Sequence, residues 1–189
     1  MPRGLSSTIK TELAKDAIAF ADLVELHFDT LYRLTNAHIP IVTATDTASS
    51  GTYTANGELM SFDSVTETGE AKVNQINLAL SGAATTYTNL FLNNDYVDRR
   101  IVIYRVFFNN SMQIVGSPIM LFDGEIQSYV INETGASSTI SITSASVFYD
   151  FERVNGRRTN QSSQHAHFPA DQGLKYSAIT IDDLKWGKP

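Results

Sequence analysis

Residues 72–81 read KVNQINLALS, and this stretch indicates the fold class. Ile76, Leu78 and Leu80 alternate in it with polar or small residues. Successive side chains of a strand point to opposite faces of a sheet, so the alternation predicts a strand with one buried and one solvated face. Strands of this kind are typical of antiparallel sheets.

Similar signals lie on both sides of this stretch. Residues 23–28 (LVELHF) also alternate, with Glu25 and His27 on the side opposite to the apolar residues. Residues 101–108 (IVIYRVFF) are apolar except for one arginine and rich in β-branched and aromatic residues, which predicts a strand buried on both faces. Asn109-Asn110-Ser111 predicts the hairpin turn that follows it.

The whole pattern predicts a mainly β fold. We expect a sandwich or barrel of roughly eight to ten short antiparallel strands, because short strand signals and turn signals alternate along the chain. A short N-terminal helix is expected, capped by Ser6 or Ser7, with Ile9 and Leu13 on one face. The other expected strands cover residues 31–34, 52–54, 112–115, 118–126, 127–132 and 138–143, and a helical turn is expected over residues 86–93.

The last quarter of the chain breaks the strand pattern. We therefore predict a β-rich domain with the N-terminal helix over residues 1–150, and an irregular C-terminal docking segment over residues 151–189 in the same structural unit. The segment carries arginines, an aromatic residue beside a proline and the only tryptophan. Loops that lack core periodicity are often where partners bind.

The composition limits the classes of function. The chain has 189 residues, 42% hydrophobic and 18% charged, with a net charge of −6 and no cysteine. Disulfides, zinc–cysteine sites and iron–sulfur clusters are thereby excluded. The acidic balance disfavours general nucleic-acid binding, which needs a basic face. The sequence displays no signal-peptide pattern and no apolar run long enough to span a bilayer, so we expect a soluble chain made in the cytoplasm.

Two patterns are candidates for chemistry. In an extended segment His165 and His167 would share one face near Asp171, as part of a two-His-one-carboxylate metal site. The simpler interpretation is two polar side chains in a solvated loop. Asp123-Gly124-Glu125 could serve a glycosidase, but the favoured interpretation is a tight turn in which glycine takes a positive φ. No catalytic, cofactor-binding or metal-binding residue is assigned.

Partner binding is the favoured role for the C-terminal segment. Arginine forks bind carboxylates, and exposed aromatics with arginine are common anchors of protein contacts. The alternative is that the two aromatics, Phe168 and Trp186, fold back over the end of the β domain. The predicted interface residues are Arg153, Arg157, Arg158, Phe168 and Trp186.

An ordered series of motifs carries a family resemblance. The series runs through residues 23–28 (LVELHF), 33–36 (RLTN), 51–53 (GTY), 58–60 (ELM), 73–82 (VNQINLALSG), 98–104 (DRRIVIY), 121–126 (LFDGEI), 152–153 (ER), 157–159 (RRT), Gln164, 168–173 (FPADQG) and 186–187 (WG). It resembles the minor tail, tail-tip, baseplate hub or distal-tail-like structural proteins of tailed bacteriophages, over nearly the whole chain.

The resemblance implies a structural protein without enzymatic activity or cofactor. Such a protein would form a homo-oligomeric ring, a trimer or hexamer, in the virion tail. The ring would connect the tail tube to the hub or fibres, and its partners would be itself and neighbouring tail proteins, not a specific nucleic acid sequence. Two alternatives remain. One is a carbohydrate- or receptor-binding β-sandwich that uses scattered tyrosines, and a less favoured one is a small metallohydrolase built on His165, His167 and Asp171.

Overall fold

The computed structural model describes residues 5–65, 72–82, 85–134, 137–152 and 158–177. The chain forms two compact units, Met1–Phe151 and Glu152–Pro189. The proposed membership of both parts in one structural unit stays a prediction. Within the described ranges, no helix is long and apolar enough to cross a membrane.

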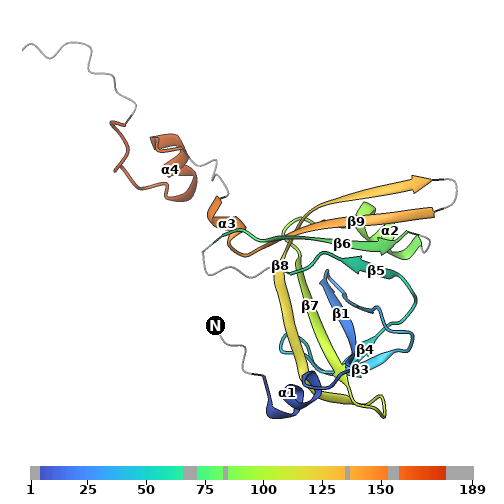
Figure 1. Cartoon of the computed structure of the whole chain (residues 1–189). Coiled ribbons are helices and arrows are strands. Elements are labelled where there is room, and N and C mark those ends of the chain that lie inside the picture. The colour runs from blue at the N-terminus through green and yellow to red at the C-terminus, as the bar shows by residue number, and fades with distance from the viewer. Residues whose placement is uncertain (1–4, 66–71, 83–84, 135–136, 153–157, 178–189) are drawn as a thin grey trace, which may run out of the picture. The chain divides into compact units, whose positions relative to one another are not determined.

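The first unit holds most of the secondary structure (Figure 1). Its elements are α1 (Ser7–Leu13), β1 (Ala19–His27), β2 (Leu31–Thr35), β3 (Ile41–Thr43), β4 (Gly51–Tyr53), β5 (Leu59–Phe62), β6 (Gln75–Ser81), α2 (Thr85–Asn93), β7 (Arg100–Phe108), β8 (Ile114–Thr134) and β9 (Ser137–Ser146), followed by the single turn α3 (Tyr149–Glu152). The mainly β fold and the short N-terminal helix are confirmed. Ser6 caps α1, because its hydroxyl accepts the Ile9 N–H at 3.3 Å.

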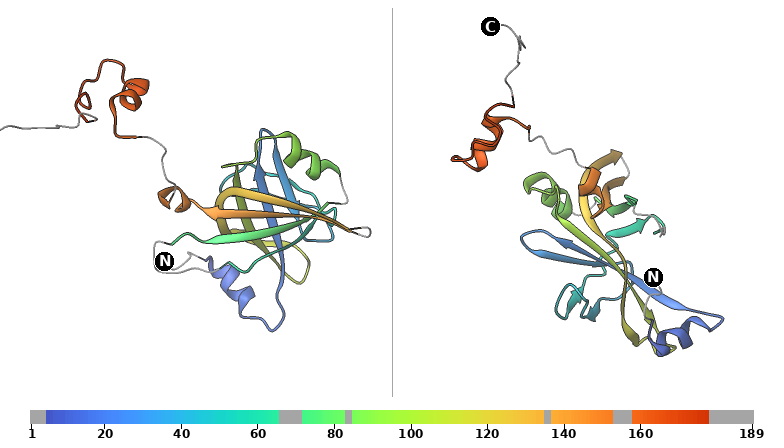
Figure 2. Two further views of the ribbon diagram at one scale, coloured as in Figure 1. Left: turned by 90° about the horizontal axis from the view of Figure 1, so that it is seen from above. Right: turned by 90° about the vertical axis from the view of Figure 1, so that its left-hand side faces the viewer.

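Seven strands form one antiparallel sheet in the order β2-β1-β7-β8-β9-β6-β5, and β3 and β4 form a separate ribbon. β8 is 21 residues long and belongs to two limbs of the sheet (Figure 1). We call β2, β1, β7 and residues 114–125 the first limb, and residues 126–134, β9, β6 and β5 the second limb. The strands of the two limbs cross (Figure 2), so the single sheet folds over itself like a sandwich.

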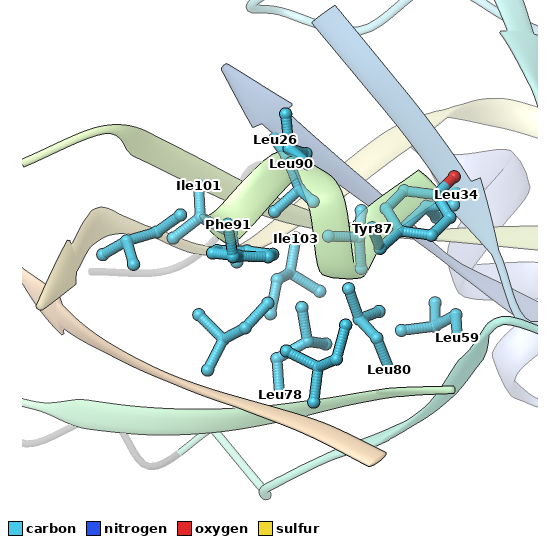
Figure 3. Close-up of a cluster of buried hydrophobic side chains, with 14 of the residues drawn as sticks. Leu26, Leu34, Leu59, Leu78, Leu80, Tyr87, Leu90, Phe91, Ile101 and Ile103 are labelled. Atoms are coloured by element: carbon cyan, nitrogen blue, oxygen red, sulfur yellow. The ribbon is translucent and has the colours of Figure 1, made fainter. Parts of the chain in front are cut away.

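The inner core fills the space between the two limbs. It joins Ile101 and Ile103 of β7 to Leu78 and Leu80 of β6, and Phe91 of α2 closes it (Figure 3). All five side chains are at most 1% exposed. The alternation of residues 75–81 therefore has the predicted cause, a face turned toward this core.

An outer core lies on the other face of the first limb. It contains Leu23, Val102 and Tyr104, and Ile41 and Tyr53 of the β3–β4 ribbon cover them. β7 is consequently buried on both faces, as residues 101–108 predicted, since alternate side chains enter the two cores.

One long strand replaces two predicted short ones. Residues 118–126 and 127–132 were expected to be separate strands, but both belong to β8. The pairing of β8 shifts register between Ile126 and Ser128, and again where it pairs with β7. Such irregularities bend a strand without ending it. Gly116, with φ +71°, lies against Ile9 of α1, so a glycine there admits both the backbone turn and the helix.

Candidate partner-binding surfaces

The C-terminal unit contains the predicted interface residues. Arg158 is exposed and Phe168 is 56% exposed, as a contact surface requires. Arg153, Arg157 and Trp186 lie outside the described residues, so the structure does not place them beside these two.

A short helix occupies the middle of this unit. α4 (Gln161–His167) begins at Asn160, whose side-chain oxygen accepts the Ser163 N–H at 2.8 Å. Asp171 returns to the helix: its carboxylate accepts the Gln164 amide at 2.5 Å and the Gly173 N–H at 2.8 Å. The Gly173 and Gln164 bonds lower the pKa of Asp171.

The extended His-Ala-His arrangement is wrong. His165 and His167 lie on a helix, where residues two apart point to different sides. The His165 ring lies 2.8 Å from the backbone oxygen of Asp171 and also contacts Gln161. The Asp171 carboxylate is bonded to Gln164 and Gly173 instead of to His165. Among the described residues no group of three or more His, Cys, Asp and Glu side chains could hold a metal. Asn160 and Gln161 start the helix that the sequence reading missed.

The two units carry opposite net charges. Residues 1–151 contain eight Lys and Arg against sixteen Asp and Glu, a net charge of −8, whereas residues 152–189 contain six against four, a net charge of +2. The basic residues of the C-terminal unit include the predicted Arg153, Arg157 and Arg158. This asymmetry favours an acidic surface as the partner of the C-terminal unit.

The first unit has an apolar hollow beside the start of β1. Ile18, Phe20, Ile39 and Met112 line it with exposures of 41%, 51%, 54% and 58%. Its volume is about 480 Å³. Single exposed apolar side chains are ordinary on protein surfaces, but several that converge on one hollow are typical of contact sites.

Beside this hollow, the first residues of β1 lie beyond the end of β2. The Asp22 N–H donates to the Asn36 side chain at 2.8 Å, and Arg105 donates to the Asp22 carboxylate at 2.7 Å and 3.3 Å. Because the backbone of Asp22 faces Asn36, the backbone of Phe20, two residues earlier, faces the same side. β2 pairs with β1 only from Leu23 onward, so this end of β1 extends past its neighbour.

The predicted turn at Asp123-Gly124 is wrong. Both residues lie inside β8, where Asp123 accepts two hydrogen bonds from Arg100 of β7, at 2.8 Å and 2.6 Å. No side chain fits at Gly124, because a Cβ there would lie 2.2 Å from the Ala145 carbonyl oxygen. Asp123 raises the pKa of Arg100 through these hydrogen bonds, so the pair links two strands.

Glu25 is a site that the sequence reading did not single out. Its carboxylate is fully buried on the outer face of the first limb. It accepts hydrogen bonds from Thr45 at 2.7 Å, from Thr47 at 2.5 Å and from the Tyr53 hydroxyl, and His27 Nε2 lies 3.1 Å away. The available signal was weak: an acid between Val24 and Leu26 in an apolar strand.

The surroundings of Glu25 keep it ionised. Burial alone would raise its pKa, but the hydrogen bonds, first from Thr47 and then from Tyr53, Thr45 and His27, together lower the pKa below its ordinary value of 4.5. Burial also raises the pKa of Tyr53, and the bond to Glu25 adds to this, so the phenol remains a donor. The cluster therefore joins β1 to the segment between β3 and β4.

Four of the tyrosines pack in or against the two cores of the first unit. Tyr53 is fully buried in the outer core and Tyr87 is 6% exposed in the inner core. Tyr96 and Tyr129 pack edge to face beside Phe91, with their ring centroids 4.7 Å apart. These contacts are those of core packing, whereas a sugar-binding groove would need open aromatic faces.

Comparison with known proteins supports the fold. No protein-family model and no curated protein matches the sequence. A solved structure described as the virion of a native gene transfer agent particle contains a chain similar to this one, with a TM-score of 0.55 and 14% sequence identity. The similarity covers 82% of this chain and 49% of that chain, so this protein spans about half the length of its structural neighbour.

Proposed function

We propose that this chain is a structural component of a phage-like virion. The observation that carries the proposal is the shared fold with a chain of a gene transfer agent virion, over 82% of the residues. The ordered motifs of the sequence, which resemble minor tail proteins of tailed bacteriophages, point in the same direction. The proposed role is non-enzymatic: the chain would contribute surfaces to an assembly.

Within that role, we place the chain at the tail tip or baseplate. Copies would form a trimeric or hexameric ring that connects the tail tube to the hub or fibres. Closed rings need a heterologous interface, in which one surface of a copy binds a different surface of the next. The opposite net charges of residues 1–151 and 152–189 supply two such surfaces.

The proposed interface joins the C-terminal segment of one copy to the acidic first unit of a neighbouring copy or tail protein. The carboxylates of the acidic first unit would be bound by Arg153, Arg157 and Arg158. An arginine side chain can hold a carboxylate with two parallel hydrogen bonds. Phe168 and Trp186 would bury apolar surface in the same contact.

Assembly of the full-length chain tests the ring. Light scattering after size exclusion, with electron microscopy, should find a closed oligomer for the natural protein. The triple variant R153E/R157E/R158E should remain monomeric, because it places like charges at the interface. The variant K10E/K15E/K72E is a matched control: it changes the net charge equally, at three exposed lysines of the first unit. It should still assemble.

Two outcomes would contradict parts of the proposal. Equal loss of assembly in both triple variants would point to net charge and not to the C-terminal arginines. If the natural protein stays monomeric at all concentrations, the proposal of a homo-oligomeric ring is refuted. The position in the particle is a separate measurement: an antibody against this chain should decorate the tail end, and decoration of the head would refute the tail-tip role.

A further inference from the structure

The segment between β3 and β4, residues 44–50, lies over the buried Glu25. We propose that Glu25 is a latch that holds this strap against the outer face of the first limb, and that protonation of the carboxylate releases the strap. The proposal is independent of where the chain sits in a virion.

The latch is built from side chains of the strap itself. Thr45 donates to one carboxylate oxygen of Glu25 at 2.7 Å, and Thr47 donates to the other at 2.5 Å. The Thr47 hydroxyl also lies 2.8 Å from the Tyr104 hydroxyl of β7. Hydrogen bonds to an ionised acceptor are about twice as strong as neutral ones, so the carboxylate is the strongest anchor of the strap.

The strap has little else to hold it. Residues 44–50 read ATDTASS, which includes no large apolar side chain. Its internal bonds, from the Thr45 and Ala48 backbone N–H groups at 3.0 Å and 3.2 Å, shape a turn but do not attach it. Arg33 holds the far end, by donating to the Ser49 carbonyl at 3.0 Å. This bond does not involve Glu25, so this end stays attached when the carboxylate is protonated.

Several groups surround the carboxylate. Among the described residues, the titratable and charged groups that contact or electrostatically influence this cluster come from every element packed against it. They are His27 of β1, Arg33 of β2, Asp46 of the strap, Tyr53 of β4, and Arg100 and Tyr104 of β7. The hydroxyl donors act on the ionised form, and they lower the pKa of Glu25 below 4.5. The latch is therefore closed above pH 4.5 and opens as the pH falls through the lowered value.

Opening of the latch would change one surface of the first unit and would not unfold it. The inner core consists of apolar side chains from both limbs and α2, so it keeps its packing when Glu25 is protonated. The released strap would uncover the polar centre of the outer core around Tyr53 and Tyr104. Asp46 would also leave the hollow that it borders beside α1. The protein would thus present a different outer face in acid.

Hydrogen exchange on the full-length chain tests the latch. Peptides that cover residues 44–50 should lose protection about tenfold between pH 5 and pH 3, after correction for the intrinsic rate, while peptides of β7 and β9 keep theirs. In E25Q the strap should exchange about tenfold faster already at pH 7 and show no further pH-dependent loss. D63N, which alters an exposed carboxylate directly after β5 in the second limb, should behave like the natural protein.

Thr47→Val keeps the test decisive if E25Q does not fold. This variant removes one donor to the carboxylate, so the pH at which the strap opens should rise above that of the natural protein. A strap with only a structural role would loosen without a shift in this midpoint. The proposal is overturned by an unchanged midpoint in Thr47→Val, or by strap protection that disappears only together with that of β7.

Discussion

The two cores of the first unit share β1 and β7 but are built differently. The inner core joins the two limbs through apolar side chains and α2. The outer core has fewer buried residues, is covered by a two-stranded ribbon, and packs around the charged Glu25. One strand therefore takes part in two kinds of packing. The inner contact depends on shape and buried area, and the outer contact depends on one carboxylate that stays ionised and hydrogen-bonded.

The largest effect should come from the inner core. Phe91→Ala should lower the free energy of unfolding by about 3–5 kcal/mol, because it leaves a cavity at a fully buried aromatic. Phe91 is 1% exposed, and the centroid of its ring lies 5.5 Å from that of Phe28 and 5.3 Å from that of Tyr129. Urea unfolding followed by circular dichroism measures the change. A loss below about 1 kcal/mol would mean that α2 is not part of the inner core.

A smaller effect is expected in the outer core. Glu25→Gln at pH 7 should lower the free energy of unfolding by about 1–3 kcal/mol, because hydrogen bonds to a charged acceptor become neutral ones. The same urea experiment at several pH values separates charge from shape. The folded pKa of Glu25 is lowered, so its contribution is present above pH 4.5 and is lost as the pH falls below it.

The natural protein should therefore lose stability relative to Glu25→Gln as the pH falls from 5 toward 3. A constant difference between the two proteins over this range would contradict the ionised state of Glu25. It would also remove the contrast between the two cores, since both would then depend on packing alone.

The smallest effect should come from a carboxylate outside both cores. Asp123→Asn removes the charge of a pair whose side chains are 30% and 45% exposed. It should change the free energy of unfolding by about 0–1 kcal/mol, because solvent screens exposed pairs. Thermal unfolding at low and high salt is a suitable measurement. A loss as large as that of Glu25→Gln would show that burial does not decide the strength of these two sites.

Local patterns predicted the inner core because it obeys the periodicity of strands and helices. Residues 75–81 and 101–108 formed the expected strands, and residues 85–93 formed the expected helix. Tyr87 and Phe91, four residues apart, both turned inward. These elements depend only on the spacing of apolar residues along the chain, two apart in strands and four apart in the helix, and a single sequence displays that spacing.

Contacts between distant segments were not predictable in the same way. The glycine of Asp123-Gly124 suggested a turn, but it is required by the approach of the Ala145 carbonyl oxygen from β9. The role of Glu25 depends on Thr45 and Thr47, twenty or more residues away, and nothing in their local pattern marks them as its partners. His165 and His167 lie in a helix and not in an extended chain, because the Asn160 side chain caps the start of that helix.

The order of the strands also sets when the chain can finish folding. β6, residues 75–81, lies between β5 and β9, and β9 consists of residues 137–146. During synthesis the β5–β6 hairpin must therefore wait for some sixty more residues before its open edge is paired. Long-range pairing of this kind slows folding and leaves edges exposed in the meantime, so the nascent chain is most vulnerable to aggregation just before β9 emerges.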